Sequence, residues 1–375
     1  MVGILTFHWA DDYGAMLQAY ALKRQLELLG EEVELVPYAP LKLTGRYRLI
    51  PICAEYRNGK LRYFVHRYMA KQNLLMGRAF WERRWNMRQF RRAYLTPRRA
   101  VKSAEKISLQ KYKTVFVGSD QVWNPEITVG LDDAYTGSIP QRGSCRLAAY
   151  GASMGGAALS EADRRKFAAH AGNGFSAVSL REKIDVESVE QMLGRSVTDV
   201  LDPVLLLDHS EWERIGKAPS EQGYILLYLT EFNLPLLRCA QALSRQTGGK
   251  LISVSKPAVL RSGGADAIQG IEERAEGGPA EFFGWLQNAD CVLTNSFHGT
   301  AFSVLLEKDF LSFRHNTRSV RQEDLLCKLG LEACLVEEVR PDEARAIWAN
   351  TDWGAARACL RRERERSKRF ILENI

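Results

Sequence analysis

The first 36 residues read as a strand, a helix and a second strand, and this order constrains the fold more than any other feature of the chain. Val2 to Phe7 is a short apolar run, and Gly14 to Leu29 carries apolar residues at helical spacing. Gly30 ends that helix, because glycine readily adopts the left-handed conformation of a helix C-terminus. Val33 to Val36 follows as the second strand. This opening predicts a parallel sheet, because a crossover helix usually joins parallel strands.

The alternation of strands and helices continues along the chain and separates into two halves, with a boundary near 205–220. Further strands are expected at 114–117, 147–150, 177–180 and 200–201, and then at 224–229, 251–254, 291–293 and 310–313. A chain of 375 residues is also too long for one ordinary core. We therefore predict an α/β protein with two Rossmann-like domains that face each other across a cleft. The expected boundaries are 1–210 for the N-terminal domain, 211–340 for the C-terminal domain and 341–375 for a C-terminal helical segment.

A basic helical insertion is expected at about 61–94, where arginines alternate with aromatic residues, in a chain of net charge +7. We interpret the aromatic residues as packed and the arginines as extended into solvent. The alternative is a surface for anionic lipid or a membrane-bound substrate, which would bring peripheral contact with the inner membrane. No recognisable nucleic-acid-binding module accompanies the basic residues, so nucleic acid is not an expected partner.

The seven cysteines are scattered and form no CxxC pair. This spacing favours reduced thiols over a disulfide framework or a zinc site, and no metal is expected. The N-terminus has no positive region before its apolar run, and no apolar run approaches the roughly 20 residues of a membrane-spanning helix. We therefore expect a cytoplasmic protein, associated with the membrane if the basic helix contacts lipid.

Four strands of the first half end in polar or glycine-rich turns, at 118–125, 151–153, 181–182 and 202–203. Ligands of open α/β sheets bind at the carboxyl ends of the strands, so these turns are the candidate wall of a site. The first turn combines a carboxylate, amides and an aromatic face, which suit a polyol or sugar ring. These groups belong to Asp120, Gln121, Trp123 and Asn124.

Two other segments offer polar groups at predicted strand ends. Asp12 and Tyr13 precede the first helix, where Asp12 is either a carboxylate of the site or a simple N-cap. Arg181 follows another strand, and its guanidinium could bind a carboxylate or phosphate, or pair with Glu182. Between Phe313 and Leu326 the chain offers three arginines and a histidine, and we expect at least one to reach the same cleft.

The segment from Thr294 to Thr300 reads as the end of a strand, a tight turn and the start of a helix, and we predict that it is the functional centre. Free N–H groups at a helix N-terminus favour an anion. His298 can act there as a general acid or as a cation facing phosphate. Gly299 permits close backbone approach, and Ser296 and Thr300 supply hydroxyls. The alternative interpretation is a capping cluster with a structural histidine.

Taken in order, these segments resemble the polysaccharide pyruvyl transferase family. The matching pieces are Gly3–His8, Asp12–Leu22, Val117–Pro125, Tyr150–Ser153, Val178–Glu182, Val200–Pro203 and Thr294–Ala301. The resemblance implies a fold similar to GT-B glycosyltransferases, with the acceptor on the N-terminal domain and the donor on the C-terminal domain. It implies transfer of pyruvate from phosphoenolpyruvate to two hydroxyls of a sugar, in a cell-surface glycan or its lipid-linked precursor. No further cofactor is implied.

The resemblance also implies roles for individual residues. Arg181 would bind the anionic groups of the donor, and His298 would contact the donor and act as general acid. Several family members have Arg-Leu where this chain has Ser296-Phe297. Arg318 or Arg321 would then replace the missing arginine, or the donor differs. The base that takes the proton of the sugar hydroxyl would be Asp120 or Asp12.

Two other function classes share these features. A GT-B-type glycosyltransferase that uses a nucleotide sugar would bind a nucleoside diphosphate and not phosphoenolpyruvate. A non-catalytic glycan-assembly or membrane-associated protein would use the basic helix at 61–94 as its interface and would be indifferent to changes at His298.

Overall fold

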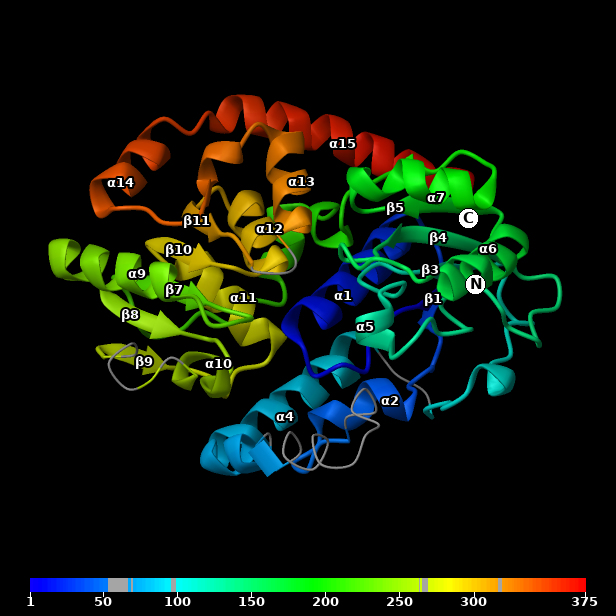
Figure 1. The fold of residues 1–375 in the computed structure, drawn as a ribbon, viewed down its shortest axis with the longest axis horizontal. Coiled ribbons are helices and arrows are strands. Elements are labelled where there is room, and N and C mark those ends of the chain that lie inside the picture. Colours follow the sequence, from blue (N-terminus) through cyan, green and yellow to red (C-terminus); the bar gives the residue numbers. More distant parts are fainter. Residues whose placement is uncertain (53–66, 69, 96–98, 263, 265–268, 316–318) are drawn as a thin grey trace. The chain divides into compact units, whose positions relative to one another are not determined.

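The computed structural model describes residues 1–52, 67–68, 70–95, 99–262, 264, 269–315 and 319–375 (Figure 1). The chain forms two compact units. The first contains Met1–Leu74, Arg88–Leu207 and Arg362–Ile375, and the second contains Leu75–Met87 and Asp208–Arg361. The last residues of the chain, expected in a separate C-terminal segment, thus belong to the first unit, and part of the basic insertion belongs to the second.

The first unit is built on a six-stranded parallel sheet with the order β2-β1-β3-β4-β5-β6. Its strands are β1 (Val2–Leu5), β2 (Val33–Leu35), β3 (Thr114–Val117), β4 (Arg146–Ala152), β5 (Ala177–Leu180) and β6 (Thr198–Asp199). Strands β1 and β3 are buried at every position, and apart from Thr114 they contain no polar side chain, so they do not alternate between apolar and polar residues.

Helices connect these strands. The α-helices are α1 (Tyr13–Leu28), α2 (Leu41–Thr44), α5 (Pro125–Thr128), α6 (Glu161–Gly174) and α7 (Val186–Leu193). The shorter helical turns are η1 (Gly45–Tyr47), η2 (Arg91–Leu95), η3 (Ala104–Lys106), η4 (Lys183–Asp185) and η5 (Pro203–Leu205). Phe167 of α6 packs in one core cluster with Val115 and Leu147 of the sheet. Helix α1 contacts β1, β2 and η5, and most of its residues are buried.

The second unit is built on another six-stranded parallel sheet, with the order β12-β11-β10-β7-β8-β9. Its strands are β7 (Tyr224–Tyr228), β8 (Lys250–Ser253), β9 (Ile271–Glu273), β10 (Cys291–Thr294), β11 (Asp309–Phe313) and β12 (Leu335–Val336). Its helices are α8 (His209–Glu213), α9 (Leu234–Thr247), α10 (Pro257–Arg261), α11 (Pro279–Asn288), α12 (Phe297–Leu305), α13 (Val320–Leu329), η7 (Glu332–Cys334) and α14 (Pro341–Ala349).

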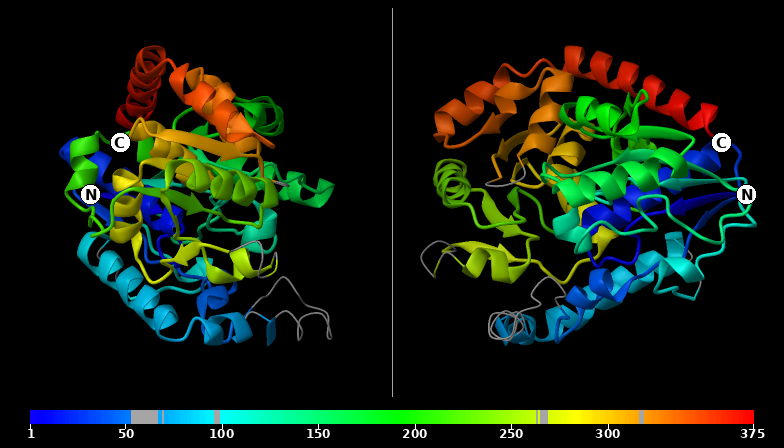
Figure 2. Two further views of the ribbon diagram at one scale, coloured as in Figure 1. Left: turned by 90° about the vertical axis from the view of Figure 1, so that its left-hand side faces the viewer. Right: turned by 45° about the vertical axis from the view of Figure 1, so that its right-hand side comes forward.

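The core of the second unit has layers on both faces of its sheet, as expected when side chains of a strand alternate between faces. Leu227 and Leu293 pack in one cluster with residues of α9. Tyr228, the neighbour of Leu227, packs instead on Phe282 of α11, with ring centroids 4.7 Å apart. Two helices have residues in both units: α4 (Arg78–Phe90) and α15 (Trp353–Glu373), which are visible from two further sides in Figure 2.

The prediction of an α/β protein with two parallel sheets is confirmed. The prediction that two such domains face each other across a cleft stays a prediction. Among the described residues, no helix is long and apolar enough to cross a membrane.

The basic insertion expected at about 61–94 is mostly helical in the residues that the structure describes, but a turn interrupts it. Helical residues at 70–75 are followed by a turn at 76–77, and Gly77 has a φ of +55° there. Helix α4 then leads into η2, which is a π-helix. Residues 61–66 and 69 lie outside the described part of the chain.

The interpretation of that segment as packed aromatics and solvated arginines is only partly correct. Phe80 and Phe90 are buried, as expected. However, Trp81 and Trp85 are 59% and 57% exposed. Arg83 is buried instead, because its Nη1 donates a hydrogen bond to the Ala275 carbonyl at 3.2 Å.

Candidate functional site

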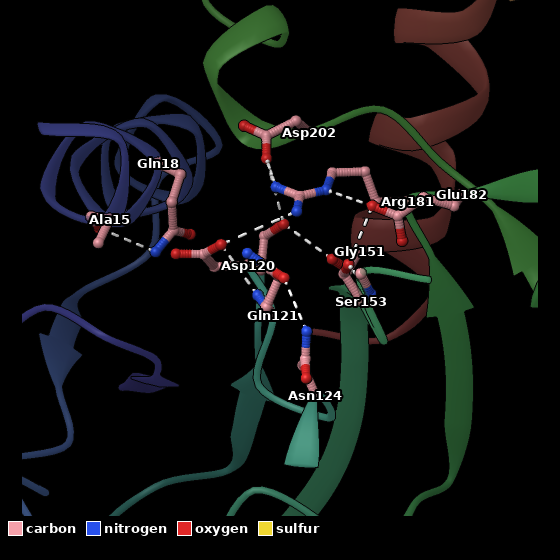
Figure 3. Close-up of polar contacts among 12 residues, drawn as sticks. Ala15, Gln18, Asp120, Gln121, Asn124, Gly151, Ser153, Arg181, Glu182 and Asp202 are labelled. Carbon is pink, nitrogen blue, oxygen red and sulfur yellow. Dashed lines mark hydrogen bonds and ion pairs between the residues drawn. The ribbon is translucent and has the colours of Figure 1, made fainter. Parts of the chain in front are cut away.

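Polar side chains that follow β3, β4 and β5 meet at the carboxyl edge of the first sheet, as Figure 3 shows. Arg181 lies at the centre and is 3% exposed. Its Nε lies 2.9 Å from a carboxylate oxygen of Glu182, and its Nη1 lies 2.5 Å from Asp202. Its Nη2 lies 3.8 Å from Asp120. Each nitrogen of the guanidinium therefore faces a buried carboxylate.

The charges around Arg181 determine its protonation. Burial alone would lower the pKa of Arg181, but the coulombic attraction of Glu182, Asp202 and Asp120 outweighs burial and raises that pKa above its ordinary value. The group is a permanent cation. The ion pair with Glu182 that the sequence allowed is present. Contact between Arg181 and a donor stays a prediction, and a donor anion would have to compete with these carboxylates.

Asp120 has a backbone conformation that is uncommon for any residue other than glycine, with a φ of 75°. The fold holds it there: its carbonyl accepts hydrogen bonds from the N–H groups of Val122 at 2.7 Å and Ser153 at 3.1 Å. Its carboxylate accepts the Gln121 N–H at 2.9 Å. Backbone strain of this kind costs on the order of 1–3 kcal/mol and gathers at functional sites.

The other residues of this turn are tied into the fold. Asn124 donates to the Gln121 side chain at 2.9 Å and also accepts the Glu126 N–H at the start of α5. The indole N–H of Trp123 donates to the Tyr135 carbonyl at 2.7 Å, and its ring packs in the core against Phe167. Trp123 and Asn124 are both 0% exposed. Their predicted contact with an acceptor would therefore require the core to open.

The loop after β1 gives its polar residues structural partners. Asp12 is the N-cap of α1 and accepts the Ala15 N–H at 3.2 Å, which is the simple capping role that the sequence allowed. Asp11 pairs with Arg91 at 2.7 Å, and Tyr13 is buried.

Two buried polar residues near this edge were not singled out as site residues. His8 donates from Nδ1 to the Thr6 carbonyl at 3.0 Å, and burial lowers the pKa of His8 to about 3, with Arg91 contributing in the same direction. Gln18 of α1 donates to the Thr6 hydroxyl at 2.8 Å, and its side chain extends toward Asp120 in Figure 3. The available signal was a glutamine within the otherwise apolar stretch from Gly14 to Leu22.

In the second unit, the predicted functional centre is the turn between β10 and α12. Ser296 is the N-cap of α12, and its hydroxyl accepts the Gly299 N–H at 3.4 Å. The Thr300 hydroxyl contacts the Ser296 carbonyl at 3.0 Å and Ser312 at 2.8 Å. His298 lies in the first turn of the helix and is 7% exposed. The hydroxyls thus support the turn itself, as in the capping interpretation.

Close packing explains why a glycine occupies position 299. A Cβ at this position would lie 2.4 Å from the Thr294 hydroxyl, which donates to the Tyr228 carbonyl at 2.6 Å. Only a glycine lets α12 start this close to β10.

Of the two arginines expected near this turn, Arg318 lies outside the described residues. Arg321 is described, and its guanidinium carbon lies 5.7 Å from the ring centre of Phe297, the residue before His298. Arg321 therefore brings a cation to the N-terminal turn of α12. No group of three or more residues that could hold a metal ion occurs in the part of the chain that the structure describes.

A comparison with models of protein families identifies one family. The family model described as "Polysaccharide pyruvyl transferase" matches residues 12–317. A comparison with curated proteins found no significant match.

Three solved structures have a similar fold at low identity. A UDP-N-acetylglucosamine 2-epimerase from Rickettsia bellii has 10% identity and a TM-score of 0.48, over 99% of this chain and 94% of that one. UGT89C1 from Arabidopsis thaliana has 12% identity and a TM-score of 0.47, over 99% and 98% of the two chains. The spinosyn rhamnosyltransferase SpnG has 11% identity and a TM-score of 0.42, over 100% and 99%.

Proposed function

Because this chain belongs to the polysaccharide pyruvyl transferase family, we propose that it transfers a pyruvyl group from phosphoenolpyruvate to hydroxyls of a sugar. The sugar is part of a cell-surface polysaccharide or its lipid-linked precursor, and the product is a pyruvate ketal. The observation that carries the proposal is the family match, which extends over residues 12–317 and includes both the Arg181 turn and the His298 turn.

The proposed reaction forms one C–H bond and two C–O bonds. A proton adds to the methylene carbon of phosphoenolpyruvate, which gives the neighbouring carbon oxocarbenium character. One sugar hydroxyl attacks that carbon and loses its proton to a base. Phosphate then leaves with the bonding electron pair, and a second hydroxyl closes the ketal and releases its proton to the phosphate. The chain must therefore supply an acid, a base and a site for about three negative charges.

We assign the acid to His298. It lies in the first turn of α12, where backbone N–H groups of a helix N-terminus favour an anion. A histidine can donate a proton near neutral pH. Ser296, Gly299 and Thr300 stay predicted donor ligands, although their hydrogen bonds within the turn suggest that they act by fixing its shape.

We assign the base to Asp120 in preference to Asp12. Asp12 is engaged as the N-cap of α1. Asp120 combines a strained backbone with a position 3.8 Å from the Arg181 guanidinium.

The donor's anionic groups need cations. Arg321 is the described arginine beside the His298 turn, and we propose that it takes the place of the arginine that other family members carry at the Ser296 position. Arg181 stays a predicted donor ligand. The carboxylates around it support a second role, in which it holds Asp120 in place.

The deciding experiment combines binding with transfer. Calorimetric titration with phosphoenolpyruvate and with UDP separates a pyruvyl transferase from a glycosyltransferase, since the first binds phosphoenolpyruvate and the second binds UDP. Phosphate release with an acceptor glycan is then measured for His298→Ala, Asp120→Asn and Arg321→Ala. We expect kcat to fall at least 100-fold for the first two variants and KM for phosphoenolpyruvate to rise for the third. Wild-type transfer by His298→Ala would overturn the assignment of the acid.

A further inference from the structure

A hollow in the second unit is flanked by two exposed tryptophans of α4. Its volume is about 690 Å³, and its lining residues are Trp81, Glu82, Trp85, Asn86 and Glu276. The two indoles are separated by four positions, so they lie on one face of the helix, one turn apart. Exposed apolar side chains that line a hollow mark an interaction site more often than scattered surface residues do.

Other side chains of α4 are anchored, so the tryptophans are presented on a fixed support. Arg83 donates to the Ala275 carbonyl at 3.2 Å, and Asn86 donates to the Glu276 carbonyl at 3.0 Å. Phe80 and Met87 are buried. Helix α4 also lies close to the loop that contains Gly278, because a Cβ on Gly278 would lie 2.9 Å from the Asn86 Cβ.

The lining has the chemistry that recognises a sugar chain. The indole faces offer flat apolar surfaces for the C–H faces of pyranose rings. The carboxylates of Glu82 and Glu276 accept hydrogen bonds from hydroxyls, and the Asn86 amide can accept as well. A few polar groups in a largely apolar hollow of this size are typical of small-molecule sites, which range over roughly 300–1,000 Å³.

Other occupants fit less well. An anionic lipid surface would meet two carboxylates in this hollow, and none of the described residues that line it is basic. A quaternary ammonium group also binds aromatic and acidic side chains. It is much smaller than a space of about 690 Å³, whereas a chain of sugar rings can extend along such a space.

We propose that this hollow is a glycan-binding subsite. It holds sugar rings of the acceptor glycan other than the sugar that receives pyruvate. The identity of the glycan as acceptor rests on the proposed function, whereas the binding itself does not. Trp81 and Trp85 stack on the rings, and Glu82 and Glu276 accept hydrogen bonds from the hydroxyls.

The binding test needs no catalysis. Wild-type protein is applied to an array of hexasaccharides of glucose, galactose, mannose and N-acetylglucosamine, and the Kd for bound sugars is measured by isothermal titration calorimetry, which does not depend on the two indoles. We expect Trp81→Ala/Trp85→Ala to raise the Kd at least 10-fold, and Trp81→Phe/Trp85→Phe to preserve most of the binding. Ile184→Ala, at another exposed apolar residue, serves as the matched control and leaves the Kd unchanged. A thermal unfolding curve checks that each variant folds.

Three results would overturn the subsite: no binding to any hexasaccharide, binding that the double alanine variant retains, or binding that choline chloride abolishes. Vesicles of phosphatidylcholine and phosphatidylglycerol provide the lipid arm, and binding to them through Trp81 and Trp85 without sugar binding would assign the hollow to a membrane surface instead. If hexasaccharides bind through the tryptophans but no pyruvyl transfer occurs, the subsite stands and the proposed function fails. If pyruvyl transfer occurs but sugar binding does not depend on the tryptophans, the proposed function stands and the subsite fails.

Discussion

Arg181 shows how a single buried cation can determine the state of its surroundings. Its guanidinium lies between Glu182 and Asp202, each 1% exposed, and near Asp120. A buried ion pair adds little net stability compared with an apolar pair, but removing one partner leaves uncompensated charge. We therefore expect the arginine to stabilise the fold whether or not it touches the donor.

We expect Arg181→Met to lower the free energy of unfolding by about 3–5 kcal/mol, because it leaves neighbouring carboxylates buried without their cation. Urea unfolding of the full chain measures the loss. The double variant Arg181→Met/Asp202→Asn should lose less free energy of unfolding than the two single variants together. The asparagine side chain at position 202 is neutral and no longer needs the cation that Arg181→Met removes. If Arg181→Met kept wild-type stability and lost only phosphoenolpyruvate affinity, direct donor binding would be its main role.

His8 predicts a specific dependence of stability on pH. Burial lowers its pKa from 6.5 to about 3, so the unfolded chain binds a proton more tightly than the folded one. The free energy of unfolding that depends on neutral His8 is fully present above pH 6.5, and it is lost as the pH falls from 6.5 toward 3. At about 1.4 kcal/mol per pH unit, the wild type should lose about 2 kcal/mol between pH 7 and pH 5. His8→Asn keeps a donor for the Thr6 carbonyl but does not titrate, so comparing urea unfolding of the two proteins isolates this effect. Parallel pH profiles would contradict it.

At the scale of elements, the strands of both sheets were predictable because most are short, buried apolar runs. The predicted strands at 114–117 and 177–180 coincide with β3 and β5. Strand β9 was missed, because Ile271–Glu273 is a short edge strand with two charged residues out of three, inside a segment that reads as a loop.

The partners within the site were harder to predict than its elements. That strand ends carry ligand groups follows from the fold class, but the pairing of Arg181 with Asp202 and Asp120 depends on the strand order β3-β4-β5-β6, which residue spacing does not reveal. Similarly, the period of α4 indicates a helix face but not which face is covered. Arg83 is buried and donates to the carbonyl of Ala275, a residue far along the chain that the local sequence does not reveal as a partner.

The junction of β10 and α12 gives a prediction for an element. We expect Gly299→Ala to destabilise the protein by about 1–3 kcal/mol, since the new Cβ would lie 2.4 Å from a hydroxyl that hydrogen bonds hold in place. Gly172→Ala is the matched control within α6, where a Cβ meets nothing within 4 Å. It should stabilise the protein by about 0.5–1 kcal/mol, the usual gain of alanine over glycine in a helix. Thermal unfolding of both variants tests the contrast, and equal effects would show that packing at the junction is loose.

At the scale of the whole molecule, the chain returns to its first unit after completing the second. Residues from Arg362 onward belong to the unit that Met1 begins. The Ser367 hydroxyl of α15 accepts the Leu201 N–H at 2.9 Å, and Arg364 donates to the carbonyl of Leu207 at 3.2 Å. The first unit therefore depends on the last turns of the chain, because its β6–η5 region takes hydrogen-bond partners from them.

Neighbouring residues of α15 test this dependence with a matched pair. Ile371 is 0% exposed in the first unit, whereas Leu372 is 57% exposed. We expect Ile371→Ala to lower the free energy of unfolding by about 2–5 kcal/mol, through lost burial and the cavity that it leaves. Leu372→Ala removes a side chain of similar size from the surface and should change stability by less than about 0.5 kcal/mol. Urea unfolding of each variant, followed by far-UV circular dichroism, measures both values. Equal losses, or none in either variant, would mean that the C-terminal turns of α15 are not part of the first core. A large loss for Ile371→Ala alone would show that the end of the chain holds together the unit that also carries the Arg181 cluster.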